Sequence, residues 1–158
     1  MNDRIVINAS PLIALGKMGL FEVARKLPLD IITPAEVRQE LDVGLLSGHS
    51  VGIPDWVEVR KLSSPITRSL FDRLDSGEAA VIQLALELEI NTVCLDEIKG
   101  RRIAKDCGLS VTGSLGILGK ARKLGIINEV APFVQLAVQD GIYYDDRLIK
   151  RFLSEMGE

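Results

Sequence analysis

The sequence predicts an α/β fold in which helices cover both faces of a central, mainly parallel sheet. Short β-branched segments alternate with helical segments along the whole chain, as in parallel α/β proteins. The helix expected over residues 78–89 is apolar nearly all round, so it must lie in the centre of the molecule. The 158 residues contain no internal repeat and no long linker, so we expect one domain over residues 1–158.

The first half of the chain begins with a strand at residues 4–7. Ser10, which precedes a proline, is the expected N-cap of a helix that ends near Lys17. A capping box at residues 33–36 predicts a further helix over residues 34–42. The other elements expected here are a helical run at 20–27, a strand at 30–33, a loop at 43–55, an edge strand at 56–60 and a short helix near 66–73.

The second half begins with the apolar helix. Asp75 as N-cap and Glu78 three residues later form a second capping box at its start. Strand 92–95 follows and leads into Asp96, and Ser114 is the expected N-cap of a later helix. The remaining expected elements are a basic helix at 98–106, a strand at 109–112, and helices from 113 to about 125, over 128–140 and over 145–156.

The composition excludes several classes of function. One His and two Cys residues argue against a zinc cluster and against a disulfide scaffold. A Ser-His-Asp triad would need His49, which is better explained as a solvated side chain in a Gly- and Ser-rich loop. No apolar stretch is long enough to span a membrane, and the N-terminus lacks the apolar core of a signal peptide, so we expect a cytoplasmic protein. An enzyme of this composition would rely on carboxylates.

Polar side chains follow two of the predicted strands. Strand 4–7 leads into Asn8, and strand 92–95 leads into Asp96. Ligands of open α/β sheets bind outside the carboxyl ends of the strands, so these two side chains mark a candidate site. The alternatives are a local turn for Asn8 and a helix cap for Asp96.

Two helical acids can join this site. Glu40 lies at the edge of the buried stripe of helix 34–42, where a solvated side chain is the alternative. Glu78 begins the buried helix, where its place in a capping box is the alternative. Carboxylates from separate elements at one sheet end are suited to Mg²⁺ or Mn²⁺, which prefer oxygen ligands.

Basic residues follow Asp96 in the sequence. Residues 99–123 contain seven Lys or Arg and one acid, a net charge of +6 within a chain of net charge −3. This distribution is compatible with a nucleic-acid partner, although solvated helix faces would explain it equally well. The four bases of helix 98–106 are Lys99, Arg101, Arg102 and Lys105.

Five segments together resemble the PIN-domain ribonucleases: IVINASPLIAL, PAEVRQEL, LDSGEAAVIQLALE, VCLDEIKGRRIAKDCGL and TGSLGILGKARKLG. They are most similar to a branch of small prokaryotic proteins related to VapC-type toxins. The resemblance implies a three-layer α/β/α sandwich and Mg²⁺- or Mn²⁺-dependent cleavage of single-stranded RNA. It also implies a small antitoxin and a homodimer as partners.

The resemblance carries over to particular residues. It implies metal binding by Asn8, Glu40, Glu78 and Asp96, with the three acids as catalytic residues. Ser10 beside Asn8 and the four bases after Asp96 would bind RNA, with Arg102 on a phosphate or paired with Glu78, and Glu97 or Ser114 would occupy a further acidic position. Most PIN nucleases have Asp where this chain has Asn8, and an amide oxygen brings no charge, so we expect weaker metal binding. A binding module without catalysis is therefore the main alternative, and a phosphoacceptor domain based on Asp96 is a minor one.

Overall fold

The computed structural model describes residues 2–48 and 51–158, and within them it contains a five-stranded sheet in which every strand pair is parallel. The strand order is β3-β2-β1-β4-β5, so the first strand is central and the chain proceeds first to one edge and then to the other. The strands are β1 (Asp3–Ile7), β2 (Leu29–Pro34), β3 (Glu58–Arg60), β4 (Thr92–Cys94) and β5 (Ser110–Thr112).

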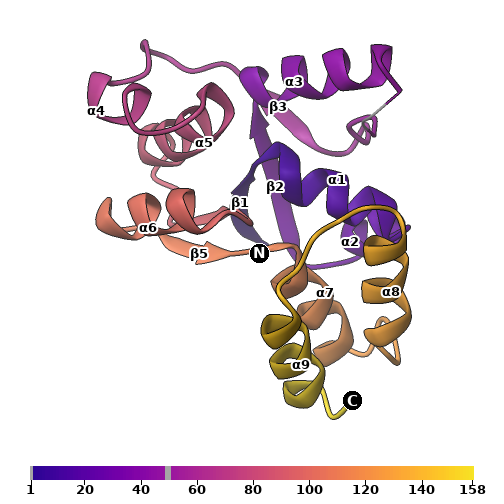
Figure 1. Ribbon diagram of the computed structural model, residues 1–158. Coiled ribbons are helices and arrows are strands. Elements are labelled where there is room, and N and C mark those ends of the chain that lie inside the picture. The colour runs from indigo at the N-terminus through magenta and orange to yellow at the C-terminus, as the bar shows by residue number, and fades with distance from the viewer. Residues whose placement is uncertain (1, 49–50) are drawn as a thin grey trace.

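Helices cover the sheet on both sides, so the predicted α/β sandwich is confirmed (Figure 1). The buried helix α5 packs against β1, β2 and β4, with α4 and α6 beside it. On the other side, α1 packs against α7 and α8. The helices are α1 (Ala9–Lys17), α2 (Phe21–Arg25), α3 (Ala35–Leu46), α4 (Arg68–Phe71), α5 (Ser76–Glu87), α6 (Ile98–Asp106), α7 (Ser114–Lys123), α8 (Ala131–Gln139) and α9 (Asp146–Glu155).

One continuous hydrophobic core extends over both faces of the sheet. The centre of the sheet is fully buried, with Val6, Ile7 and Val93 at 0% exposure. Helix α5 is buried from Gly77 to Ala85, which confirms the central place predicted for it. None of the helices that the structure describes is long and apolar enough to cross a membrane.

Three of the predicted N-caps are wrong, because the residue lies inside the helix or its hydroxyl bonds to another element. Ser10 lies inside α1, and Asn8 occupies the N-cap position without a capping hydrogen bond from its side chain. The Thr33 hydroxyl donates to the carbonyl of Ile7 at 2.8 Å, and α3 begins after Pro34 without a side-chain cap. Ser114 is the first residue of α7 rather than its N-cap.

The other differences concern the ends of elements. Helix α3 continues to Leu46 and so occupies the start of the predicted loop 43–55, whereas β3 is shorter than predicted but does lie at a sheet edge. The hypothesis for His49 concerns a residue outside the described ranges. Cys94 and Cys107 are both free, the first buried and the second exposed.

Candidate active site

The candidate site lies where β1 and β4 end. The backbone N–H of Asn8 donates to the carbonyl of Cys94 at 3.1 Å, which joins the ends of the two central strands. The backbone N–H of Leu95 donates to the carbonyl of Thr112 at 2.9 Å, which joins the end of β4 to β5. Parallel pairing thus brings Asn8 and Asp96 together at the carboxyl ends of the two strands, as predicted.

Three side-chain oxygens surround Gly77 at the start of α5. A Cβ atom on Gly77 would lie 3.2 Å from Glu40 Oε1, 3.3 Å from Asn8 Oδ1 and 3.5 Å from Asp75 Oδ1. The missing side chain of Gly77 therefore leaves room for oxygens from three separate segments. We call Asn8, Glu40, Asp75 and Glu78 the Gly77 cluster.

Glu78 is the most deeply buried acid of this cluster. It is 4% exposed, and its backbone N–H donates to Asp75 Oδ1 at 2.8 Å, which confirms Asp75 as the N-cap of α5. Glu78 Oε2 and Asn8 Oδ1 are both buried without a hydrogen-bond partner among residues 2–48 and 51–158. Gly100 of α6 makes room for the carboxylate, since a Cβ there would lie 2.5 Å from Glu78 Oε2. Buried oxygens without donors are costly, so this cluster favours an added proton or cation.

Burial and the neighbouring carboxylates raise the pKa values of two acids in this cluster. Burial, followed by the carboxylates of Asp75 and Glu97, raises the pKa of Glu78 to about 8. The same causes raise the pKa of Glu40, whose carboxylate reaches Gly77 although the residue as a whole is exposed. A divalent cation would remove this repulsion by replacing the protons.

Asp96 belongs to a separate group of hydrogen bonds. Its Oδ1 accepts from the backbone N–H of Ser114 and its Oδ2 from the Ser114 hydroxyl, both at 2.8 Å. Burial raises the pKa of Asp96, against the lowering effects of Ser114 and of the Arg101 guanidinium. Asp96 therefore bonds to the first residue of α7, and the alternative that it caps α6 is wrong, since Glu97 occupies that position without a side-chain cap bond.

Tyr144 completes this second group. Its hydroxyl lies 2.6 Å from Ser114 Oγ, and Ser114 is 0% exposed. The Arg101 Nη1 atom donates to the carbonyl of Leu95 at 2.6 Å, so this base supports the end of β4.

The oxygen ligands present are few, which suits Mg²⁺ or Mn²⁺ better than an ion that needs many acidic side chains. Within the described residues, no group of three or more His, Cys, Asp or Glu side chains is arranged to hold a metal ion. Mg²⁺ usually takes only one or two carboxylates and completes its shell with water and substrate phosphate. Glu40, Glu78 and the amide oxygen of Asn8 are the side chains that would hold such an ion, with Asp96 at the adjacent strand end.

The predicted RNA-binding residues differ in how far their side chains are exposed to solvent. Lys99, Arg102 and Lys105 are exposed on α6, whereas Arg101 is half-buried and bonded to the backbone. Ser10 is half-buried in the first turn of α1. Arg102 is exposed, and Glu78 Oε2 has no partner in the part of the chain that the structure describes, so the suggested pairing of these two residues is not seen.

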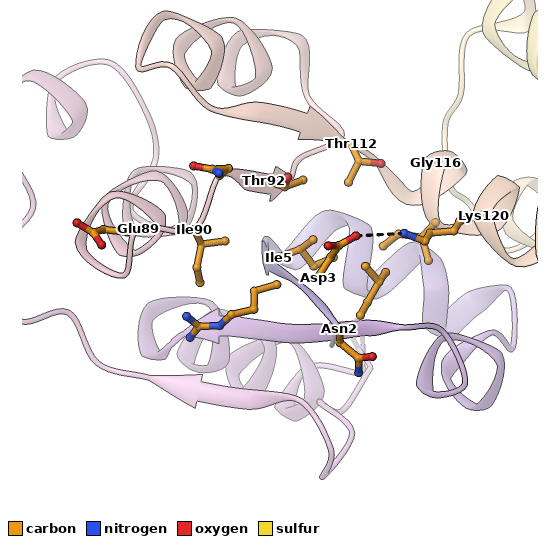
Figure 2. A pocket seen from close by; sticks show the side chains of 13 residues that line it. Asn2, Asp3, Ile5, Glu89, Ile90, Thr92, Thr112, Gly116 and Lys120 are labelled. Carbon is orange, nitrogen blue, oxygen red and sulfur yellow. Dashed lines mark ion pairs between the residues drawn. The ribbon is translucent and has the colours of Figure 1, made fainter.

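Two cavities lie away from these residues. The first, of about 490 Å³, is at the amino ends of β1 and β4, where Asp3 and Lys120 form an ion pair of 3.8 Å (Figure 2). The second, of about 770 Å³, is a groove between the start of α3 and residues 61–66. Neither is lined by a residue of the predicted acidic site.

Two members of the site, Asp75 and Tyr144, were not predicted as such from the sequence. Asp75 was expected only to cap α5, although its run Asp75-Ser76-Gly77-Glu78 contained the signal for an acidic cluster. Tyr144 has no local signal, because it reaches Ser114 only through the return of the chain between α8 and α9.

An α/β sandwich with a parallel sheet, which has Asn8 and Asp96 after its central strands and Glu40 and Glu78 on neighbouring helices, defines the class of protein. The family model DUF3368, described as a PIN domain, matches residues 4–158. The chain therefore belongs to the PIN-domain family, whose fold is associated with nucleases, divalent-metal dependence and nucleic-acid binding. No curated protein matches the chain.

Proposed function

We propose that this PIN domain is a Mg²⁺- or Mn²⁺-dependent endoribonuclease that cleaves single-stranded RNA. The observation that carries the proposal is that Asn8 Oδ1 and Glu78 Oε2 are buried oxygens without a partner among the described residues, and that Asn8 Oδ1 shares the space beside Gly77 with Glu40 Oε1. The raised pKa values of two acids in one cluster indicate that a bound cation would stabilise their ionised carboxylates.

The roles of the residues follow from their positions. Glu40, Glu78 and Asp96 are the proposed catalytic acids and metal ligands, and the Asn8 amide oxygen is the fourth ligand. A bound divalent cation would supply an activated water and neutralise charge that develops on the phosphodiester. Arg101 and Ser114 hold Asp96 and the end of β4 in place.

The exposed bases of α6 are the proposed RNA contacts. Lys99, Arg102 and Lys105 follow Asp96 on one short helix, so they can bind phosphates next to the acids. Arg101 would contribute charge rather than a free side chain, and Ser10 would contact RNA from the first turn of α1.

Cleavage of a defined single-stranded RNA with Mn²⁺ tests the proposal. We expect metal-dependent cleavage by the natural sequence and at least about a hundredfold loss in Asp96→Asn, because a catalytic carboxylate is removed. Asp106→Asn is the matched control, since it changes an exposed acid at the end of α6. Equal activity of the two variants would exclude a catalytic role for Asp96.

A second candidate function is RNA binding without catalysis. The observation that favours it is the neutral side chain of Asn8, which leaves the cluster one charge short of the usual PIN pattern. RNA binding in a gel shift without metal-dependent cleavage would support this candidate. Cleavage that appears only in Asn8→Asp would identify the amide as the cause.

We further propose that the chain is one domain over residues 1–158, acts in the cytoplasm and forms a homodimer. The similarity of its motifs to the VapC-related branch supports a role as a toxin that a small antitoxin inhibits. Induced expression should then arrest growth, and Glu78→Gln should not. Growth that is unaffected by the natural sequence argues against the toxin role, and a monomer in sedimentation argues against the dimer.

A further inference from the structure

We propose that Tyr144 is a positioning residue that fixes the Asp96 carboxylate through the Ser114 hydroxyl; the functional part of this inference rests on the proposed metal-dependent activity. The three side chains form a chain of hydrogen bonds from the C-terminal part of the molecule to the end of β4. Tyr144 OH lies 2.6 Å from Ser114 Oγ, which lies 2.8 Å from Asp96 Oδ2.

The direction of these hydrogen bonds follows from the number of protons. A metal-binding Asp96 must be ionised, so its oxygens only accept. The Ser114 hydroxyl has one proton, and that proton is used in the bond to Asp96 Oδ2. Tyr144 must therefore donate to Ser114 Oγ, and each hydroxyl strengthens the next bond in the series.

Tyr144 is held so that it can act as this donor. The residue is 9% exposed, and burial raises the pKa of its phenol, which keeps the proton in place. The backbone N–H of Ile142 donates to the carbonyl of Ala137 at 2.9 Å, which fixes the segment as it leaves α8. On the other side, the Asp145 side chain accepts from the backbone N–H of Arg147 at 2.8 Å and so caps α9.

The C-terminal helices thereby gain a connection to the acidic site. Figure 1 shows the segment between α8 and α9 returning past the start of α7. Helix α9 is packed onto α7 at Phe152, whose Cε1 lies 3.1 Å from the point that a Cβ on Gly119 would occupy. Phe152 and Tyr144 both bind this part of the chain to α7, and of these two it is Tyr144 that reaches a hydroxyl bonded to a site acid.

A double-mutant cycle on Mn²⁺ affinity tests the inference. Tyr144→Phe keeps the ring and removes only the hydroxyl, and we expect it to weaken Mn²⁺ binding about three- to tenfold. Ser114→Ala should weaken binding about tenfold or more, because it removes a direct partner of a ligand. Adding Tyr144→Phe to Ser114→Ala should cause no further loss, since the connection is already broken.

The neighbouring tyrosine supplies a matched control. Tyr143 is 85% exposed, so Tyr143→Phe removes a hydroxyl from the adjacent residue without altering the bond to Ser114. It should bind Mn²⁺ as the natural sequence does. Tyr144→Phe affinity equal to this control would overturn the inference, as would losses for Tyr144→Phe and Ser114→Ala that simply add in the double variant.

Hydrogen exchange in the metal-free protein separates this inference from the proposed function. The Ser114 amide donates to Asp96, and Tyr144→Phe should speed its exchange several-fold without altering amides of β1. Absence of Mn²⁺ binding by the natural sequence would overturn the proposed function and the metal-related role of Tyr144. Unchanged Ser114 exchange in Tyr144→Phe would overturn the hydrogen-bond chain itself, whatever the result with metal.

Discussion

Glu78→Gln should remove most of the pH dependence of stability in the metal-free protein. The pKa of Glu78 rises from 4.5 to about 8 on folding, chiefly through burial and then through Asp75 and Glu97. The folded state therefore holds a proton that the unfolded chain has already released, over the range between these two values. The favourable contribution of this group is complete below the lower pKa, and it is lost as pH rises through the upper one.

The magnitude follows from the size of the shift. A full proton difference changes the free energy of unfolding by about 1.4 kcal/mol per pH unit, which is the upper limit of the slope. Glu40, a member of the Gly77 cluster, is exposed, so solvent screening reduces this effect. We expect a loss of about 0.5–1 kcal/mol per pH unit between about pH 5 and about pH 8.

Urea unfolding of metal-free protein across that pH range provides the assay. The natural sequence should lose stability as pH rises, and Glu78→Gln should show a clearly flatter profile with the higher stability at alkaline pH; the raised pKa values of Glu40 and Asp96 account for the slope that remains. Glu155→Gln, an exposed acid of α9, should follow the natural sequence. Parallel profiles for the natural sequence and Glu78→Gln would refute the account of the buried carboxylate.

Three other changes test separate parts of the structure. Gly100→Ala places a methyl group 2.5 Å from Glu78 Oε2. Because this displaces a proposed ligand, Mn²⁺ affinity measured by calorimetry should fall at least about tenfold while the fold stays intact. Unchanged affinity would contradict the packing of Gly100 against Glu78. Arg102→Ala should weaken RNA binding at low salt and reduce the salt dependence by about one charge, whereas an unchanged salt slope would exclude a phosphate contact. Glu87, whose pKa is lowered to about 2 chiefly by the Ser63 backbone N–H, stabilises the fold above pH 4.5. Glu87→Gln should therefore cost less than about 1 kcal/mol at neutral pH, and the difference from the natural sequence should shrink in acid, as unfolding curves at several pH values will show.

The order of strands and helices could be predicted because hydrophobic patterning and turn residues act locally. Each predicted strand has a counterpart in the sheet, and the apolar helix beginning after Asp75 is central as expected. Two of the three wrong caps failed because the hydroxyl has a partner from another element. Thr33 bonds to β1 and Ser114 bonds to Asp96, and neither partner is close in sequence.

The candidate site could be predicted in outline for a similar reason. Parallel strands place their carboxyl ends together, so Asn8 and Asp96 were expected to be neighbours, and the Asn8 N–H bond to Cys94 joins those ends. The division of the acids into two groups was not predictable, because it depends on the side-chain bonds of Ser114 and Asp75. Tyr144 depends on the path of the chain after α8, which no spacing in the sequence encodes.

A crystal of the protein soaked with Mn²⁺ shows, through the anomalous signal of the metal, whether the Gly77 cluster binds a divalent cation. We expect a peak within about 2.0–2.3 Å of Asn8 Oδ1 and of carboxylate oxygens from Glu40 and Glu78. An Asn8→Ala crystal treated in the same way should show a weaker peak there. A saturated crystal with no peak at the Gly77 cluster, or with its strongest peak elsewhere, would contradict the claim that this PIN domain holds a divalent cation there.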